Sequence, residues 1–405
     1  MEELARESIS LLAKPGADCG TPSLSSMGAI FIMLKSALGA GLLNFPWAFN
    51  KAGGMHTAVT VELGSLIFLI SGLVILGYAS SLSNHSTYQG VVRDVCGPAI
   101  GKLCGICFIF NLFMISVAFL RVVEDQLEKL CDSLHTNVTM DAMGEKLKPW
   151  YADERLAMSL LCLVVILPLS IPKEISFQKY TSASLASMFS VIPTICFGFQ
   201  CHEACITIYS SMKNKSLSNW VVVSVVSMLI CLLIYSLTGI YGFFTFGENV
   251  AADILMSYPG NDAVVIVARL LFAISIITIY PIILLLGRSV LQEAWLDHKY
   301  MTAYVSASYE RFVRVILTVL WILVTLIIAL FVPDISEIIS VIGGISAFFI
   351  FIFPGLCLIC AMETEVMNQK KKSCLIAWGI ISVICGAYIF GQSTTIAVME
   401  LLHKF

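Results

Sequence analysis

Long apolar stretches separated by short polar connections make up nearly the whole chain. A helix needs roughly 20 mostly apolar residues to cross a bilayer, and ten stretches of the sequence meet that need. Their compositions leave no room for an aqueous domain, so the pattern predicts an all-α integral membrane protein with about ten spans. The predicted spans are residues 27–49, 55–80, 101–123, 156–172, 185–211, 219–245, 263–289, 311–332, 337–361 and 374–398.

Charge in the short connections predicts the sidedness of these spans. Lys and Arg in short loops remain on the cytoplasmic side, so Arg6 and Lys14 place the N-terminus inside. Residues 1–26 are polar and contain no apolar signal-peptide core. We therefore expect a cytosolic N-terminal tail over 1–26, followed by a transmembrane domain over 27–398.

The connection 124–155 is expected to be an extracellular loop. Its charge is mixed, and it contains Asn137, Val138 and Thr139. This triplet is an N-glycosylation acceptor pattern, which is used only on the luminal side. Such triplets also arise by chance, but agreement with the charge-derived sidedness favours glycosylation at Asn137.

One segment breaks the alternation of sides. Lys179 precedes stretch 185–211 and Lys213 follows it, and both lysines are expected on the cytoplasmic side. A single crossing cannot have both ends on one side, so either this stretch is re-entrant or a helix is absent before it. The join from Tyr180 to Ser187 is short and rich in small polar residues, which favours the absent helix.

The first span contains residues that weaken a helix. Gly39 and Gly41 lower helix propensity, and Pro46 removes a backbone donor. These residues predict an unwound stretch near the membrane midplane. Unwinding frees carbonyls that can bind a cation and exposes amides that can hold a carboxylate. The alternative is close helix packing through small residues.

A second interruption is predicted in the fifth stretch. Pro193 and Gly198 are followed by Gln200, His202 and Glu203. Ionisable side chains inside a span are costly and usually functional, although a lone histidine can also hydrogen-bond a backbone carbonyl. Two broken helices in separate halves of a chain are typical of inverted-repeat transporters.

Two hydroxyl side chains in the span 263–289 are candidates for a cation site. Ser275 and Thr278 are three residues apart and therefore share a helical face. Hydroxyl oxygens suit a hard cation such as sodium. The alternative is that each hydroxyl bonds the carbonyl one turn before it.

Lys35 is a charged residue about one turn before Gly39, at the depth where cation ligands would lie. It is a functional candidate for that reason. It could act as a tethered positive charge in place of a bound ion, or it could pair with Glu203 or Glu62.

Composition and motifs exclude other classes of function. Charged residues make up 13% of the chain, against about a quarter in soluble proteins, and the mean hydropathy is +0.89. The net charge of −3 offers no basic field for nucleic acid. The spans contain no GxSxG, HExxH or paired-carboxylate pattern, so an enzyme is not expected. The CxxC pairs have no flanking His or Asp cluster, so no metal site or cofactor is expected either.

The motifs at the two interruptions resemble a known family. The run 36–46, Ser-Ala-Leu-Gly-Ala-Gly-Leu-Leu-Asn-Phe-Pro, and the run 197–203, Phe-Gly-Phe-Gln-Cys-His-Glu, resemble the first-helix and sixth-helix motifs of solute carrier family 38, the sodium-coupled neutral amino acid transporters. The resemblance extends from about Ser25 to the end of the chain. It implies a leucine-transporter-like inverted-repeat fold of eleven helices. It also implies alternating-access symport of glutamine, alanine and similar substrates with sodium.

The same resemblance implies where the ligands bind, and it shows two departures. The helix expected fifth is absent between Ser182 and Ser187, which would leave this form inactive for want of one helix. Lys35 stands where most members have Asn, and its charge opposes a nearby cation. The implied substrate contacts are Gly39, Ala40, Gly41, Leu42, Phe199 and Gln200, and the implied sodium ligands are Ser36, Gly39, Ser275 and Thr278.

Other readings remain open at this stage. With Lys35 as an ion surrogate, transport would be sodium-independent or proton-linked. The chain could also be an amino-acid sensor that signals through partners. The acidic dileucine-like pattern from Glu7 to Leu12 is a candidate adaptor site. Adaptor binding would direct the chain to endosomes or lysosomes instead of the plasma membrane.

Overall fold

A computed structural model describes residues 24–52, 54–83, 85–134, 191–259, 262–300, 307–331 and 335–402. Over these ranges the regular structure is helical, apart from one isolated bridge between Leu24 and Met212. The expected all-α class is therefore confirmed for the described part of the chain. The helices, in chain order, are α2 (Ser26–Ala37), η1 (Ala40–Leu43), α3 (Phe45–Lys51), α4 (Met55–Leu82), α5 (Tyr88–Cys96), α6 (Pro98–Leu134), α9 (Val191–Gly198), α10 (His202–Ser211), α11 (Leu217–Phe246), η4 (Gly247–Asn249), α12 (Ile254–Ser257), α13 (Ala263–Tyr300), α14 (Ala307–Phe331), α15 (Ile335–Ala347), η5 (Phe348–Ile352), α16 (Phe353–Thr364) and α17 (Gln369–Leu402).

Seven helical segments of the described chain are long and apolar enough to cross a membrane. Their bounds agree with seven of the predicted spans, and the largest difference is at the end of the predicted span 101–123, where the helical segment continues to Leu130. The predicted span 156–172 lies outside the described residues, so the total of about ten spans stays a prediction. The seven segments are Met55–Leu82, Pro98–Leu130, Leu217–Phe246, Ala263–Arg288, Arg311–Phe331, Ile338–Thr364 and Gln369–Thr395.

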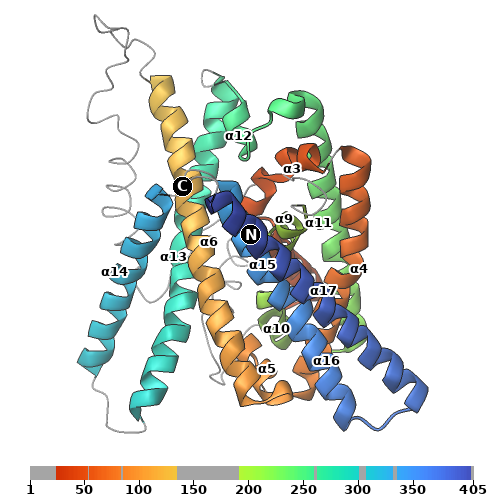
Figure 1. Ribbon diagram of the computed structural model, residues 1–405. Coiled ribbons are helices and arrows are strands. Elements are labelled where there is room, and N and C mark those ends of the chain that lie inside the picture. The colour runs from red at the N-terminus through yellow and green to blue at the C-terminus, as the bar shows by residue number, and fades with distance from the viewer. Residues whose placement is uncertain are drawn as a thin grey trace, which may run out of the picture.

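The two interrupted spans lie inside a ring of continuous helices. In Figure 1, α6, α13 and α14 stand on one side, α4 and α11 on the other, with α3 and α9 between them. The α11 helix packs on α2, α3 and α4, and α15 packs on α9, α6 and α17. Many apolar side chains on the outer faces are exposed, as lipid-facing positions require.

Close backbone contact fixes the first half of the second interrupted span. A Cβ built on Gly343 of α15 would lie 2.1 Å from the carbonyl oxygen of Pro193 in α9. Only glycine allows this approach, because any side chain would overlap the backbone of α9. The α15 helix therefore holds α9 directly against the middle of the molecule.

The helix α6 continues past the point where the sequence predicts a loop. We expected an extracellular loop over 124–155, but α6 remains helical to Leu134. Arg121 pairs with Glu124 and Asp125, one turn further along the same helix. Ion pairs at this spacing stabilise a helix, which explains why it extends beyond the apolar part. The predicted glycosylation site Asn137 lies outside the described residues.

Candidate functional site

The first predicted span is interrupted where its glycines lie. The α2 helix ends at Ala37, a short 3-10 turn follows over Ala40–Leu43, and α3 begins at Phe45. Gly39 is extended, with φ −131° and ψ −157°, and Pro46 occupies the first turn of α3, where its missing N–H is not needed. The backbone therefore leaves the α-helix between Ala37 and Phe45, as the sequence predicts.

The second predicted span is interrupted just after Gly198. The α9 helix ends there, and α10 begins at His202. The three residues between them, Phe199, Gln200 and Cys201, are buried and lie outside any helix. Both predicted interruptions are thus present, and each leaves helix-end carbonyls and amides without intrahelical partners.

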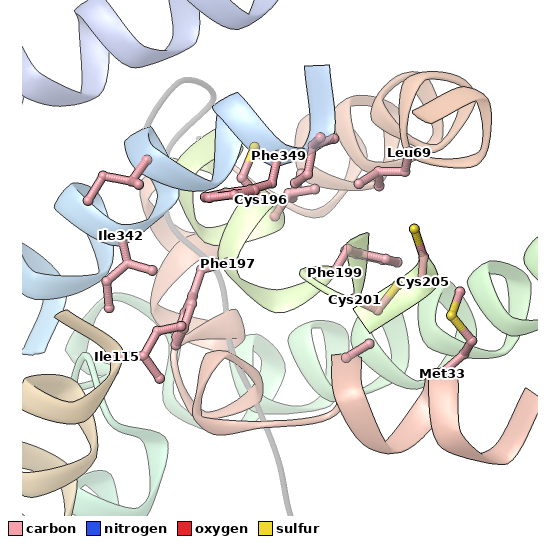
Figure 2. Packing of buried hydrophobic residues seen from close by; sticks show 14 of the residues in the cluster. Met33, Leu69, Ile115, Cys196, Phe197, Phe199, Cys201, Cys205, Ile342 and Phe349 are labelled. Atoms are coloured by element: carbon pink, nitrogen blue, oxygen red, sulfur yellow. The ribbon is translucent and has the colours of Figure 1, made fainter. Parts of the chain in front are cut away.

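The two interruptions are in direct contact. A Cβ built on Gly41 would lie 2.9 Å from Cα of Gly198 and 3.1 Å from Cδ1 of Phe197. No side chain fits at residue 41, so glycine allows the two backbones to touch. Figure 2 shows Phe197 directed toward Ile115 of α6, while Phe199 lies on the side of Cys205. The unwound backbones of both spans therefore form one site.

Tyr235 of α11 joins the two interruptions, and the sequence analysis did not single it out. Its hydroxyl oxygen lies 2.8 Å from the carbonyl oxygen of Ala37 and 2.7 Å from that of Gly198. Its ring stacks on Phe45 at 4.2 Å between ring centroids and lies 4.7 Å from the ring of Phe199. A buried tyrosine hydroxyl needs a polar partner. A tyrosine in an apolar span is therefore a signal, readable from the sequence, that a polar group lies beside it.

Polar side chains from three elements surround the second interruption. Gln200 accepts a hydrogen bond from the hydroxyl of Ser346 in α15 at 2.7 Å. Glu203, in the first turn of α10, accepts one from Nδ2 of Asn111 in α6 at 2.6 Å. Asn111 and Ser346 were not predicted, because nothing local to α6 or α15 marks them as facing this site.

His202 adopts the alternative that the sequence left open, a hydrogen bond to a backbone carbonyl. Its Nε2 lies 3.0 Å from the carbonyl oxygen of Leu69 in α4, and the ring is fully buried. This contact ties the start of α10 to α4. A role for His202 in coupling is a proposal without a direct contact to the interruptions.

Of the two alternatives for Lys35, the pairing with Glu203 or Glu62 is not present in the structure. Within the described part of the chain, the Lys35 side chain is exposed and has no ion-pair or hydrogen-bond partner. Glu62 is buried and accepts a hydrogen bond from Ser236, and Glu203 is bonded to Asn111.

One member of the hydroxyl pair of α13, Thr278, bonds carbonyls of its own helix. The Thr278 hydroxyl donates to the carbonyl oxygens of Ile274 and Ser275, at 2.8 and 3.0 Å. Its oxygen still has lone pairs for a cation. Ser275 is buried and Ser36 is exposed, and α13 packs mainly against α6 and α14. The sodium position across Ser36, Gly39, Ser275 and Thr278 therefore stays a proposal.

The segment around α12 covers one end of the interruptions. Asn44, between η1 and α3, donates from Nδ2 to the carbonyl oxygen of Ala252 at 2.9 Å. Its Oδ1 accepts from the hydroxyl of Thr194 in α9 at 3.2 Å. One side chain therefore connects the first interruption, the second span and the covering segment.

Asp253 anchors the same segment to the continuous helices. It accepts from Nε2 of Gln126 in α6 at 2.6 Å, and from the backbone N–H of Leu255 at 2.8 Å. Burial raises the pKa of this carboxyl to about 7, against the lowering effects of the Leu255 amide, Arg269 and Gln126. Asp253 therefore binds a proton in the folded state at pH values where an exposed aspartate is ionised.

This raised pKa makes stability depend on pH. Between about pH 4 and 7 the folded chain holds a proton that the unfolded chain releases, so the free energy of unfolding falls as pH rises through that range. We expect Asp253→Asn, which keeps a helix-capping oxygen, to flatten this fall. The measurement is the thermal unfolding midpoint at pH 5 and pH 8 in detergent. Asp262→Asn is the control, because Asp262 is exposed and also caps a helix, and an equal flattening by both variants would contradict the assignment.

Comparison with known proteins places these features in a family context. The family model for transmembrane amino acid transporter protein matches residues 22–186 and 176–398. A Xenopus tropicalis relative, whose name is that of a sodium-coupled neutral amino acid transporter 8, is 74% identical, with all of both chains covered. Human solute carrier family 38 member 8 is 57% identical, covering 99% of this chain and all of that one.

A more distant relative and a solved structure extend the comparison. Sodium-coupled neutral amino acid transporter 7 of Danio rerio is 42% identical, over 98% of this chain and 94% of its own. The crystal structure of MhsT in complex with L-phenylalanine superposes with a TM-score of 0.54 at 14% identity, covering 92% of this chain and all of that one. This likeness of fold supports the expected leucine-transporter-like architecture.

One of these alignments is longer than this chain. The alignment with the Xenopus tropicalis relative runs over 440 positions, whereas this chain has 405 residues, all of them aligned. About 35 positions of that alignment therefore hold no residue of this chain. The two segments matched by the family model overlap at 176–186, which is where the alternation of sides fails.

Proposed function

Because the chain belongs to the family of transmembrane amino acid transporter proteins, we propose that it is a secondary active carrier that moves neutral amino acids such as glutamine and alanine together with sodium. The contact between Gly41 and Gly198 is the observation that carries the proposal. It brings together the backbone of two interrupted spans, which is the arrangement that forms substrate sites in broken-helix transporters. The names of the relatives support sodium coupling and neutral amino acids as the ligand classes.

The free backbone groups supply the chemistry for an amino-acid zwitterion. The substrate carboxylate docks on the amides of residues 39–42, in and just before the short turn η1 that leads into α3. Its ammonium group docks on carbonyls freed by the interruptions. Phe199 and Gln200 form the opposite wall, where both are buried. Binding then favours one of the two orientations of the interrupted helices relative to the continuous ones, which is alternating access.

The coupling ion is proposed to bind Ser36, Gly39, Ser275 and Thr278, between the first span and α13. Lys35 supports the alternative of sodium-independent or proton-linked transport, because it is a cation close in sequence to Ser36 and Gly39 that has no ion-pair partner among the described residues. A fixed positive charge opposes a nearby sodium ion by Coulomb repulsion. The hydroxyl groups of Ser275 and Thr278 favour a sodium ion at this position. The charge of Lys35 favours the alternative in which the lysine takes the place of the ion.

We infer that a helix of the family fold is absent from this chain before α9. The gap of about 35 aligned positions is long enough for one membrane span and its flanks. The same gap explains why lysines on both sides of stretch 185–211 are expected on one side of the membrane. We expect this form to lack one wall of the site, and uptake to be at background until the segment is supplied.

Uptake in proteoliposomes tests the carrier and its ion. Labelled glutamine is supplied outside, with either sodium or choline, to the chain carrying the roughly 35 residues that the Xenopus tropicalis relative has at the gap. Saturable uptake supports a carrier, whereas saturable binding without flux supports a sensor. Sodium-driven uptake supports symport, and equal uptake in choline supports the sodium-independent alternative.

Replacing Lys35 by asparagine is expected to strengthen sodium dependence. The change removes the charge that opposes the cation, so we expect the sodium concentration for half-maximal uptake to fall by roughly tenfold, which corresponds to about 1.4 kcal/mol. Lys102→Asn is the matched control, because Lys102 is also exposed but lies at the start of α6. If uptake by Lys35→Asn and by the parent chain depended identically on sodium concentration, the hypothesis that Lys35 acts in place of an ion would be wrong.

The remaining proposals concern where the chain resides. A multi-pass location in the plasma membrane is proposed, with endosomes or lysosomes as the alternative if adaptors read residues 7–12. Glycosylation at Asn137 would place the loop after α6 outside. Both features lie beyond the described residues, so they rest on the sequence patterns alone.

A further inference from the structure

The hydroxyl of Tyr235 lies where the carbonyl ends of both interrupted helices converge. Ala37 is the last residue of α2, and Gly198 is the last residue of α9. Carbonyls at the C-terminal end of a helix have no intrahelical donor and carry partial negative charge. Two such carbonyls that face one point have the chemistry of a cation site, and discontinuous helices bind coupling ions in this way.

In this chain that point is already occupied. The Tyr235 oxygen is 2.8 Å from one carbonyl oxygen and 2.7 Å from the other, so its single proton donates to one while the hydroxyl stays in contact with the second. An ion bound to both carbonyls would have to displace the hydroxyl. The partly positive hydroxyl hydrogen therefore stabilises the partial negative charge of the carbonyl oxygens, as a bound cation would.

The ring of Tyr235 cannot easily move aside to admit an ion. It is fully buried, and it is stacked on Phe45 with an interplanar angle of 8°. Phe199 contacts it from the second interruption, and Gly198 has no side chain to push it away. The hydroxyl is held on the carbonyl pair by aromatic packing from both interrupted spans.

We propose that the Tyr235 hydroxyl is the permanent occupant of the carbonyl pair of Ala37 and Gly198 in place of a coupling cation. No sodium ion binds between the two interruptions, and a sodium ion that drives transport has only the position between the first span and α13. This inference rests on the proposed function for its meaning in transport. The number of sodium sites that it predicts can be measured without an uptake assay.

A sodium titration of thermal stability tests the assignment. The variant Tyr235→Phe removes the hydroxyl and keeps the ring, so it frees the two carbonyls while leaving the stacking in place. We expect this variant to gain one saturable sodium-dependent rise in unfolding midpoint, by roughly 2–4 °C, because a ligand that binds only the folded state stabilises it. Choline chloride keeps the ionic strength constant, and the purified chain is measured in detergent as it stands.

The matched control is Tyr241→Phe, which makes the same change on the same helix at an exposed position. Wild type and Tyr241→Phe are expected to share one curve with at most one sodium phase. A Tyr235→Phe curve equal to theirs would overturn the proposal. If Tyr235→Phe does not elute as a folded species, the wild type decides the matter: two saturable sodium phases overturn the proposal, and one or none supports it.

Failure of the proposed function gives a different result. If the chain with the absent segment inserted (the helix-restored chain) neither binds nor transports glutamine, the carrier proposal is wrong, whatever the sodium titration shows. Conversely, normal uptake together with an unchanged Tyr235→Phe titration would remove the assignment of Tyr235 alone.

Discussion

Supplying the absent segment at the join between Ser182 and Ser187 is expected to raise labelled glutamine uptake from background to at least roughly tenfold above it. The insert is made of the roughly 35 residues of the Xenopus tropicalis relative that have no counterpart in this chain. In the proposed function it provides one span, which restores the alternation of sides and completes the wall of the site. Initial uptake rates in proteoliposomes, normalised to incorporated protein, measure the effect. A tenfold change corresponds to about 1.4 kcal/mol in the barrier.

A flexible insert of equal length is the control that distinguishes the effect of the added helix from the effect of added chain length. A Gly/Ser sequence cannot cross the hydrocarbon layer, because its backbone groups would lack partners there. It should leave uptake at background. Full uptake by the chain without any insert would show that the site is complete as it stands and that stretch 185–211 is accommodated in another way.

Replacing Gly41 by alanine in the helix-restored chain is expected to reduce uptake by at least roughly tenfold. The added Cβ would lie 2.9 Å from Cα of Gly198, and both partners are backbone, so neither can rotate away. Overpacking of a tight contact costs roughly 1–3 kcal/mol, and here the strain falls on the two segments that bind substrate. Initial rates and half-saturating glutamine concentration are measured together, since a displaced site alters both.

The matched control for this substitution is Gly64→Ala in α4. Gly64 is exposed, and a Cβ there meets no atom within 4 Å, so uptake should be unchanged. Gly41→Leu enlarges the same overlap and should abolish uptake. If Gly41→Leu transports glutamine at the parental rate, the contact between the two interruptions is not the substrate site.

The spans and the two interruptions could be predicted because their causes are local. An apolar stretch of sufficient length has to be a helix in lipid, since its backbone groups have no other partners. Gly39 and Pro46 weaken the helix that contains them, and Pro193 and Gly198 act in the same way on theirs. The observed helix ends at Ala37 and Gly198 follow from these residues.

The side-chain partners at the site could not be predicted in the same way. Lys35 illustrates the difficulty, because the sequence places its charge near Gly39 but gives no partner. The two carboxylates that seemed available are bonded to Ser236 and Asn111 instead. Which partner a polar side chain finds depends on the rotation of its helix and on its neighbours, and neither is encoded within one span.

The sequence by itself determined that this protein is a bundle of membrane helices with two broken spans, because hydropathy and helix propensity act on neighbouring residues. Only the tertiary structure decided that Gly41 touches Gly198, and that Tyr235 closes the carbonyl ends of both spans. Tyr235 is 198 positions from Ala37 and 37 from Gly198. Contacts over such separations depend on how whole helices pack, which no local pattern specifies.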